Sequence, residues 1–158
     1  MSIETVRAFF AELGREQDVL EFDVSSATVE LAAQAVGVIP ARIAKTLTFA
    51  GNDDTTIMIV AAGDVKIDNG KFKACFGHKA KMLSAEAALA ATGHAVGGIC
   101  PFALPTDGSV RVYTDVSLQR FDTVFPAAGS ASSAIELTCD ELFRYSGSLA
   151  WVDVCKLS

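Results

Sequence analysis

The sequence predicts a single α+β domain built on a mixed or antiparallel sheet, and three observations support that class. Short β-rich segments are interspersed with short helical segments, without the regular strand-helix alternation of a parallel α/β sheet. The length of 158 residues suits one domain, at roughly 100 to 200 residues per domain. A 51% share of hydrophobic residues is enough to build one core. We therefore expect residues 1–158 to fold as one unit.

Five segments carry helix signals. In the first, apolar side chains from Ile3 to Leu13 recur at helical spacing, and Gly14 can end the helix. Three others begin with a Ser or Thr that can cap the first turn, and two of these end beside a glycine. The last has Glu141 three positions after Thr138, which is the spacing of a capping box. The expected helices are residues 3–13, 29–36, 72–76, 84–92 and 138–145.

Residues 43–50 and 55–62 are β-rich and flank the turn-forming run Gly-Asn-Asp-Asp, so they predict a hairpin. Residues 93–105 contain three glycines and two prolines, a composition typical of a shaped loop rather than a regular element. Shorter strands are expected over residues 19–24, 110–113, 123–125, 134–137 and 149–154.

Charge and hydropathy exclude several classes of protein. Thirteen Lys and Arg against nineteen Asp and Glu give a net charge of −6. This charge has the wrong sign for wrapping nucleic acid through counterion release, so any nucleic-acid partner must be held locally. The longest apolar run, residues 57–63, is far shorter than the roughly 20 residues of a membrane span. The N-terminal segment also lacks the apolar stretch of a secretory signal, so we expect a soluble, cytoplasmic protein without a membrane partner.

The cysteines predict no metal site. Four cysteines and two histidines form no CxxC pair and none of the spacings of a zinc site, so neither a metal nor another cofactor is expected. Cys100 follows His94 by six residues, which leaves a Cys/His nucleophile pair as one possibility. Because no third residue that would orient His94 is identifiable, the favoured interpretation places Cys100 in the wall of a pocket.

Lys45 is the first candidate for chemistry. By strand alternation it shares one face with Ile43, Leu47 and Phe49. Two interpretations remain open: the stem can carry the ammonium to solvent at the edge of the sheet, or the ammonium can point into a pocket. In a pocket, the low dielectric would strengthen its attraction for a carbonyl or phosphate oxygen.

Two further segments have candidate roles. Residues 97–101, Gly-Gly-Ile-Cys-Pro, can present backbone N–H groups to an oxyanion or a water, because glycine permits close approach of a ligand. Residues 64–81 carry five lysines against two aspartates, which is either a solvated face or a local contact for phosphates.

The order and spacing of six motifs resemble those of the YbaK-type aminoacyl-tRNA deacylases, which are related to the editing domain of bacterial prolyl-tRNA synthetases. The resemblance covers about residues 28–142. The motifs are TVELAAQAVGV (28–38), IAKTLTF (43–49), GDVKIDNGKF (63–72), TGHAVGGICPFAL (92–104), VYTDVSLQRFDTVFPAAGS (112–130) and IELTCDEL (135–142).

The resemblance implies a mixed, partly barrel-like sheet with flanking helices, and hydrolysis of the ester that joins a wrong amino acid to tRNA. Lys45 matches the functional lysine of the family, and residues 97–101 match its GxxxP loop, which lies beside the scissile ester. The family needs no metal. The implied protein is a free-standing deacylase for tRNA mischarged with a small amino acid, with the tRNA acceptor end as partner and a synthetase as a second possible partner.

These arguments together predict a site. Its catalytic groups are Lys45, Gly97 and Gly98, and its tRNA contacts are Lys66, Lys71 and Lys73. The predicted substrate-binding residues are Thr28, Ile43, Leu47, Ile99, Cys100, Pro101, Phe102, Gly129 and Ser130.

Two alternatives to the deacylase remain at the level of sequence. One is a catalytically silent module that binds an aminoacyl or nucleotide ligand in the same pocket. The other is a hydrolase or redox sensor that depends on Cys100. The sequence leaves the amino acid, the tRNA and the oligomeric state open.

Overall fold

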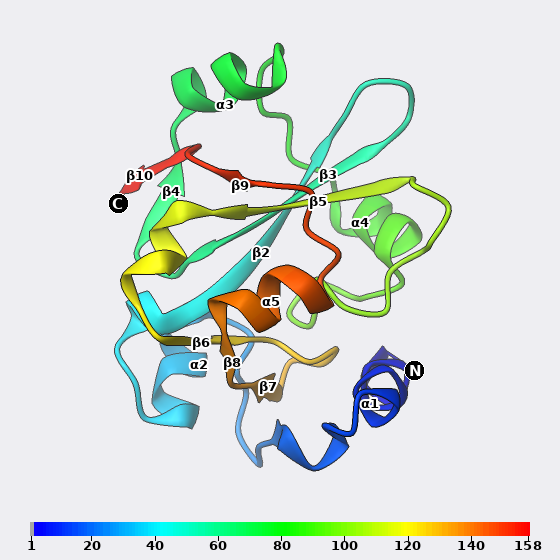
Figure 1. Cartoon of the computed structure of the whole chain (residues 1–158), viewed down its shortest axis with the longest axis vertical. Helices are drawn as coiled ribbons and strands as arrows, with labels where there is room; N and C mark the ends of the chain where they lie inside the picture. The colour runs from blue at the N-terminus through cyan, green and yellow to red at the C-terminus, as the bar shows by residue number, and fades with distance from the viewer. Residues whose placement is uncertain (1) are drawn as a thin grey trace.

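The computed structural model describes residues 2–158, which form helices on both sides of a curled, six-stranded sheet (Figure 1). The strand order in this sheet is β8-β6-β2-β3-β5-β9, and two further pairs, β1-β7 and β10-β4, form small sheets of their own. The helices are α1 (Ser2–Glu12), α2 (Val29–Val36), α3 (Asn69–Phe76), α4 (Ala85–Thr92) and α5 (Cys139–Tyr145). The strands are β1 (Val19–Glu21), β2 (Ile43–Ala50), β3 (Thr56–Ala62), β4 (Val65–Ile67), β5 (Val110–Asp115), β6 (Thr123–Pro126), β7 (Ser133–Ile135), β8 (Leu137–Thr138), β9 (Trp151–Val152) and β10 (Cys155–Leu157).

The sheet is mixed, as predicted. β2 pairs antiparallel with β3, whereas β6 lies parallel to β2 and β5 lies parallel to β3. β3 is buried at every position because strands flank it on both sides and other elements cover both faces. The α+β class predicted from the sequence is therefore confirmed.

Most helix ends agree with the sequence signals. The capping box at Thr138 and Glu141 is present, and Gly37 and Gly93 end α2 and α4 in the left-handed conformation. α3 begins earlier than predicted, at Asn69, because the Asp68 side chain accepts a hydrogen bond from the Lys71 backbone N–H at 3.0 Å.

Three strand predictions were wrong in extent, and two strands, β4 and β10, were missed. The expected strand 19–24 ends at residue 21; the segment 134–137 divides into β7 and β8; and the segment 149–154 contributes only β9, before β10 begins at residue 155. β4 was missed because three residues carry too little pattern. It is stabilised by pairing with β10, almost ninety positions later in the sequence.

β2 has an open edge at residues 45–47, and this feature positions the candidate site. β6 pairs with β2 only at Ile43 and Ala44. At the other end of β2, the Leu83 N–H donates to the Thr48 carbonyl at 3.0 Å, and the Ala50 N–H donates to the Lys81 carbonyl at 2.8 Å. Between these two pairings, no strand of residues 2–158 covers the edge.

α1 packs over the glycine-containing loop, residues 93–105. The Phe10 and Phe102 rings meet edge to face at 4.9 Å between centroids, and both side chains are fully buried. The loop is therefore fixed by core packing. Within residues 2–158, no helix is both long enough and apolar enough to cross a membrane.

Candidate active site

A cavity of about 310 Å³ lies against the open edge of β2. Its walls come from β2, the start of α2, the glycine-containing loop, the segment before α4 and the end of β6. The cavity brings together six of the predicted site residues: Lys45, Gly97, Thr28, Ile43, Leu47 and Ile99. Two of the three predicted catalytic residues, Lys45 and Gly97, therefore share a cavity with four of the predicted substrate-binding residues.

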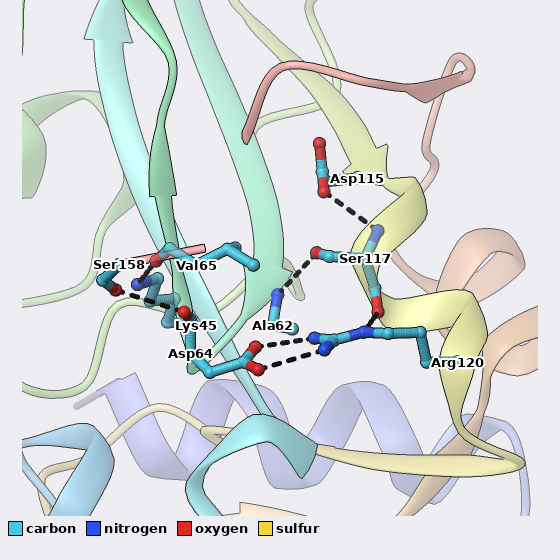
Figure 2. A network of polar contacts seen from close by, with 8 residues as sticks. All are labelled: Lys45, Ala62, Asp64, Val65, Asp115, Ser117, Arg120 and Ser158. Carbon is cyan, nitrogen blue, oxygen red and sulfur yellow. Dashed lines mark hydrogen bonds and ion pairs between the residues drawn. The ribbon is translucent and has the colours of Figure 1, made fainter. Parts of the chain in front are cut away.

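Lys45 is half-buried, and its Nζ donates a hydrogen bond to the Val65 carbonyl oxygen of β4 (Figure 2). Burial lowers the pKa of Lys45, while the negative charges of Asp64 and Glu30 act in the opposite direction. The ammonium is thus bound by a backbone carbonyl, and Lys45 is one of the residues that line the cavity.

A polar network holds the turn between β3 and β4, which immediately precedes Val65 (Figure 2). Arg120 makes two hydrogen bonds to the Asp64 carboxylate, at 2.6 and 3.0 Å, and its Nε donates to the Ser117 carbonyl at 2.7 Å. The Ser117 hydroxyl in turn accepts from the Ala62 N–H at 3.2 Å. The hydrogen bond from Arg120 is the main reason that the pKa of Asp64 is lowered. This network fixes the carbonyl that orients Lys45.

Gly97 and Gly98 allow the loop to approach its neighbours. Gly97 has φ +95°, a conformation that other residues rarely adopt. A Cβ on Gly98 would lie 2.7 Å from the Ser130 Cα, so only glycine fits there. The Gly98 N–H donates to the Ala95 carbonyl at 2.9 Å and is therefore already used within the loop. The Gly97 N–H donates to none of residues 2–158, which makes it the better candidate for a substrate contact.

The other predicted binding residues are not among those that line this cavity. Cys100 and Phe102 are fully buried, and Pro101 borders a second hollow beside Phe9. Gly129 lies against the Ser2 backbone of α1, and Ser130 lies against Gly98. These residues therefore lie in the loop or in the core that packs against it, outside the cavity lining.

Cys100 and His94 do meet, but inside the core. The Cys100 Sγ lies 3.6 Å from the His94 Nε2, which also contacts the Phe102 carbonyl oxygen at 2.8 Å, and the His94 Nδ1 is hydrogen-bonded to the Ser2 hydroxyl. Burial raises the pKa of Cys100 to about 12 and lowers the pKa of His94. The thiol is therefore protonated at neutral pH, which is the wrong state for a nucleophile.

If the hydrolysis that the resemblance implies takes place in this cavity, Cys100→Ala should keep its rate within about twofold of the unmodified protein, because Cys100 does not line the cavity. The free energy of unfolding should fall by about 1 kcal/mol, as is typical for a small core truncation. Turnover and thermal melting measured on the same sample check both effects. A variant that melts normally but turns over no ester would instead identify Cys100 as a nucleophile.

Ser26 and Thr46 also line the cavity, although no pattern in the sequence singles them out. Both hydroxyl oxygens are buried and have no hydrogen-bond partner within residues 2–158. Their position beside the cavity depends on how the segment before α2 folds over β2. No local sequence pattern predicts this arrangement. The lysines placed in the predicted tRNA contact lie elsewhere, on β4 and α3, and are exposed.

Comparison with known proteins bears on this arrangement. The family model described as "Aminoacyl-tRNA editing domain" matches residues 23–145. The protein YwhH of Bacillus subtilis (strain 168) is 57% identical over 156 residues, which covers 99% of this chain and 98% of YwhH. The Enterococcus faecalis (strain ATCC 700802 / V583) protein named "Putative Cys-tRNA(Pro)/Cys-tRNA(Cys) deacylase EbsC" is 29% identical over 111 residues, which covers 70% of this chain and 66% of EbsC.

A solved structure described as "Crystal structure of a putative trans-editing enzyme for prolyl tRNA synthetase" superimposes with a TM-score of 0.86. Its sequence is 27% identical, and the match covers 98% of this chain and 97% of that chain. The family match includes every residue that lines the cavity, from Ser26 to Ala134. The chain therefore belongs to the YbaK-type aminoacyl-tRNA editing domain family.

Proposed function

We propose that this protein is a free-standing deacylase that hydrolyses the ester of tRNA mischarged with a small amino acid. The observation that carries the proposal is the position of the Lys45 ammonium, held by the Val65 carbonyl at the wall of a small cavity that also contains Gly97. The membership of the chain in the aminoacyl-tRNA editing domain family supports the class of substrate.

In the proposed reaction, water adds to the ester carbonyl carbon, and the bond from that carbon to the ribose oxygen then breaks. The ribose oxygen leaves with a proton as a free hydroxyl, and the amino acid leaves as its carboxylic acid. Lys45 and the Gly97 N–H stabilise the negative charge that develops on the carbonyl oxygen. Lys45 is the one ionisable side chain among the described residues of the cavity lining, so we assign proton transfer to the substrate's own neighbouring ribose hydroxyl.

The cavity lining implies that the acyl group is selected by its size. The cavity is bounded by aliphatic side chains, which include Ile43, Leu47 and Ile99. Its volume of about 310 Å³ is at the lower end for ligand pockets, so large acyl groups are excluded by contact with these walls. A pocket of this kind separates substrates by only about 1 to 3 kcal/mol per methylene.

A deacylation panel tests the proposal. One tRNA transcript, charged in turn with Ala, Ser, Cys, Pro and Thr, is incubated with the protein, and the loss of the ester is followed against the uncatalysed reaction. We expect at least one small aminoacyl ester to be hydrolysed faster than its background. Binding without acceleration for every ester would contradict the hydrolase and favour a silent binding module.

The exposed lysines of β4 and α3 are the proposed contacts for tRNA phosphates. Lys71 already binds the Asp153 carboxylate at 3.0 Å and the Cys155 carbonyl at 3.1 Å, so part of its charge is used within the protein. Lys66 and Lys73 are exposed, and no ion pair is formed by either within residues 2–158.

We therefore expect Lys66→Ala and Lys73→Ala to weaken tRNA binding more than Lys71→Ala does. Each lost phosphate contact should reduce the slope of log affinity against log salt by about 0.7. Binding titrations at several salt concentrations measure both quantities. Unchanged affinity and slope in the Lys66 and Lys73 variants would remove this surface from the tRNA contact.

A further inference from the structure

The cavity lies beside the backbone of β2 and not against one face of the strand. All six residues from 43 to 48 line it, although consecutive side chains of a strand point to opposite faces. A cavity that touches each residue in turn must therefore lie at the edge of the strand. Burial along β2 agrees, because residues 45–47 are partly exposed whereas residues 43, 44, 48 and 49 are buried.

The backbone groups that point outward at this edge belong to Thr46. In an antiparallel pair, alternate residues direct their N–H and C=O groups away from the partner strand. The Thr48 carbonyl accepts from the Leu83 N–H, so Thr48 directs these groups away from β3, and Thr46 has the same parity. Pairing with β6 ends at Ala44, and neither backbone group of Thr46 bonds a loop or turn within residues 2–158. One donor and one acceptor are thus left at the cavity.

The Thr46 side chain has no part in this edge. It lies on the opposite face of β2 from Lys45, and its hydroxyl oxygen is buried. The backbone is therefore what Thr46 offers to a ligand.

The open edge has room for one residue. The strand is already bonded on both sides of Thr46, by β6 at Ala44 and by Leu83 at Thr48, so a longer peptide strand cannot pair there. Two facing residues of an antiparallel pair exchange both of their backbone hydrogen bonds. An aminoacyl group can make this exchange, because its amine and its carbonyl flank one Cα as in a peptide residue. Among the described residues, the lining contains no carboxylate, so a backbone carbonyl is the natural acceptor for the amine.

We propose that the aminoacyl group binds as a one-residue antiparallel strand, in which its α-amine donates to the Thr46 carbonyl and its ester carbonyl oxygen accepts from the Thr46 N–H. This inference rests on the proposed deacylase function and adds a requirement for a free α-amine. When water adds to the ester carbon, negative charge develops on that oxygen, and the Thr46 N–H stabilises it together with Lys45 and the Gly97 N–H. The side chain of the aminoacyl group takes no part in the pairing, so this requirement is independent of selection by size.

The first test removes the amine. One tRNA transcript is acylated with alanine or with propionate, which differ by the amine alone, and the smaller propionyl group also fits within the walls. Each rate is divided by the uncatalysed rate of the same ester, because an ammonium group itself activates the ester. We expect at least about tenfold more acceleration for the alanyl ester, the usual contribution of a hydrogen bond from a charged group. Equal accelerations would overturn the pairing.

The second test removes the backbone donor. Incorporation of the α-hydroxy acid analogue of threonine at position 46 turns the amide between Lys45 and Thr46 into an ester, which deletes the N–H and keeps the side chain. We expect kcat to fall at least about tenfold, as for the loss of one oxyanion donor, while the preference for alanyl over propionyl persists. Normal kcat in this variant would overturn the assignment of the N–H.

The same analogue at position 55 is the matched control. It deletes the Thr55 N–H, which donates to the Asn52 carbonyl at 3.1 Å in the hairpin turn, outside the cavity lining. We expect kcat to stay within about twofold of the unmodified protein, as for a change remote from the site. An equal loss of kcat at positions 46 and 55 would overturn the role of Thr46, because a general effect of the backbone ester would then explain it.

Affinities separate this inference from the deacylase. Adenosine analogues that carry alanine or propionate through a 3′ amide lack the ester bond, and calorimetry with the unmodified protein gives their dissociation constants. Tighter binding of the alanyl analogue supports the pairing even if no ester turns over, a result that contradicts the deacylase alone. Equal affinities without turnover of any ester would overturn both.

Discussion

Lys45→Met should lower kcat/KM for the hydrolysed ester by at least about 100-fold, the usual cost of removing one group that stabilises an oxyanion. Methionine keeps most of the apolar stem but has no charge and cannot donate to the Val65 carbonyl. The change therefore removes electrostatic stabilisation with little loss of packing. Steady-state rates on one charged tRNA measure the effect.

Lys156→Met is the matched control, because Lys156 is an exposed lysine of β10 outside the cavity. Its rate should stay within about twofold of the unmodified protein, in line with the small effects of surface substitutions. Equal rates for Lys45→Met and Lys156→Met would show that the ammonium of Lys45 takes no part in hydrolysis.

The proton on Lys45 gives the activity an alkaline limit. Because burial lowers the pKa of Lys45, the ammonium loses its proton at a lower pH than an exposed lysine does. The acceleration over background should decline as the pH rises through that lowered pKa, and Lys45→Met should lack this limb. Measuring the rate of both proteins from neutral to alkaline pH, relative to the uncatalysed ester, tests the assignment.

Gly98→Ala should be the most damaging substitution in the glycine loop. The added Cβ would lie 2.7 to 2.9 Å from three backbone atoms of Ser130, which cannot rotate away as a side chain could. The loop must shift, at a cost of about 1 to 3 kcal/mol in unfolding free energy. Because a shift of about 1 Å can reduce a rate about 100-fold, we expect activity to fall more than stability does.

Gly70→Ala tests whether any added methyl group has this effect. Gly70 lies in α3, where an added Cβ would lie 3.3 Å from the Asp68 Oδ1, so this side chain must shift by a few tenths of an ångström, while alanine favours the helix over glycine. We expect normal turnover and an equal or higher melting temperature. A Gly98→Ala protein with normal turnover would mean that contact with Ser130 does not fix the position of the loop.

Local signals explain how much of the fold was predictable. The β2-β3 hairpin, the Thr28 cap and the capping box at Thr138 each depend on residues within a few positions of one another. Such patterns act before tertiary contacts form, so they can be read from the sequence. The divided strands after residue 130 depend instead on distant partners, β1 for β7 and β6 for β8.

The candidate site, too, was predictable where it depends on local sequence and not where it depends on distant strands. Alternation along β2 placed Lys45 on an apolar face, and glycine composition marked the loop that lines the cavity with it. The carbonyl that binds the ammonium comes from β4, whose strand partner is β10. Phe102 is buried by packing under α1, and Cys100 is buried beside His94. Their predicted place in the pocket wall rested on the loop that resembles the GxxxP loop of the family, and a loop motif does not report burial.

The pairing of β4 with β10 also bears on the order in which the molecule matures on the ribosome. The residues of β10 are synthesised long after Lys45, and the Ser158 N–H and hydroxyl both bond to the Asp64 carbonyl at 3.1 Å. A nascent chain whose β2-β3 hairpin has left the ribosome, but whose β10 has not, lacks the strand that pairs with β4. The Val65 carbonyl, which binds Lys45, is then not yet held in place. The anchor of Lys45 is thus completed only after β10 has been synthesised, well after the hairpin that carries the lysine.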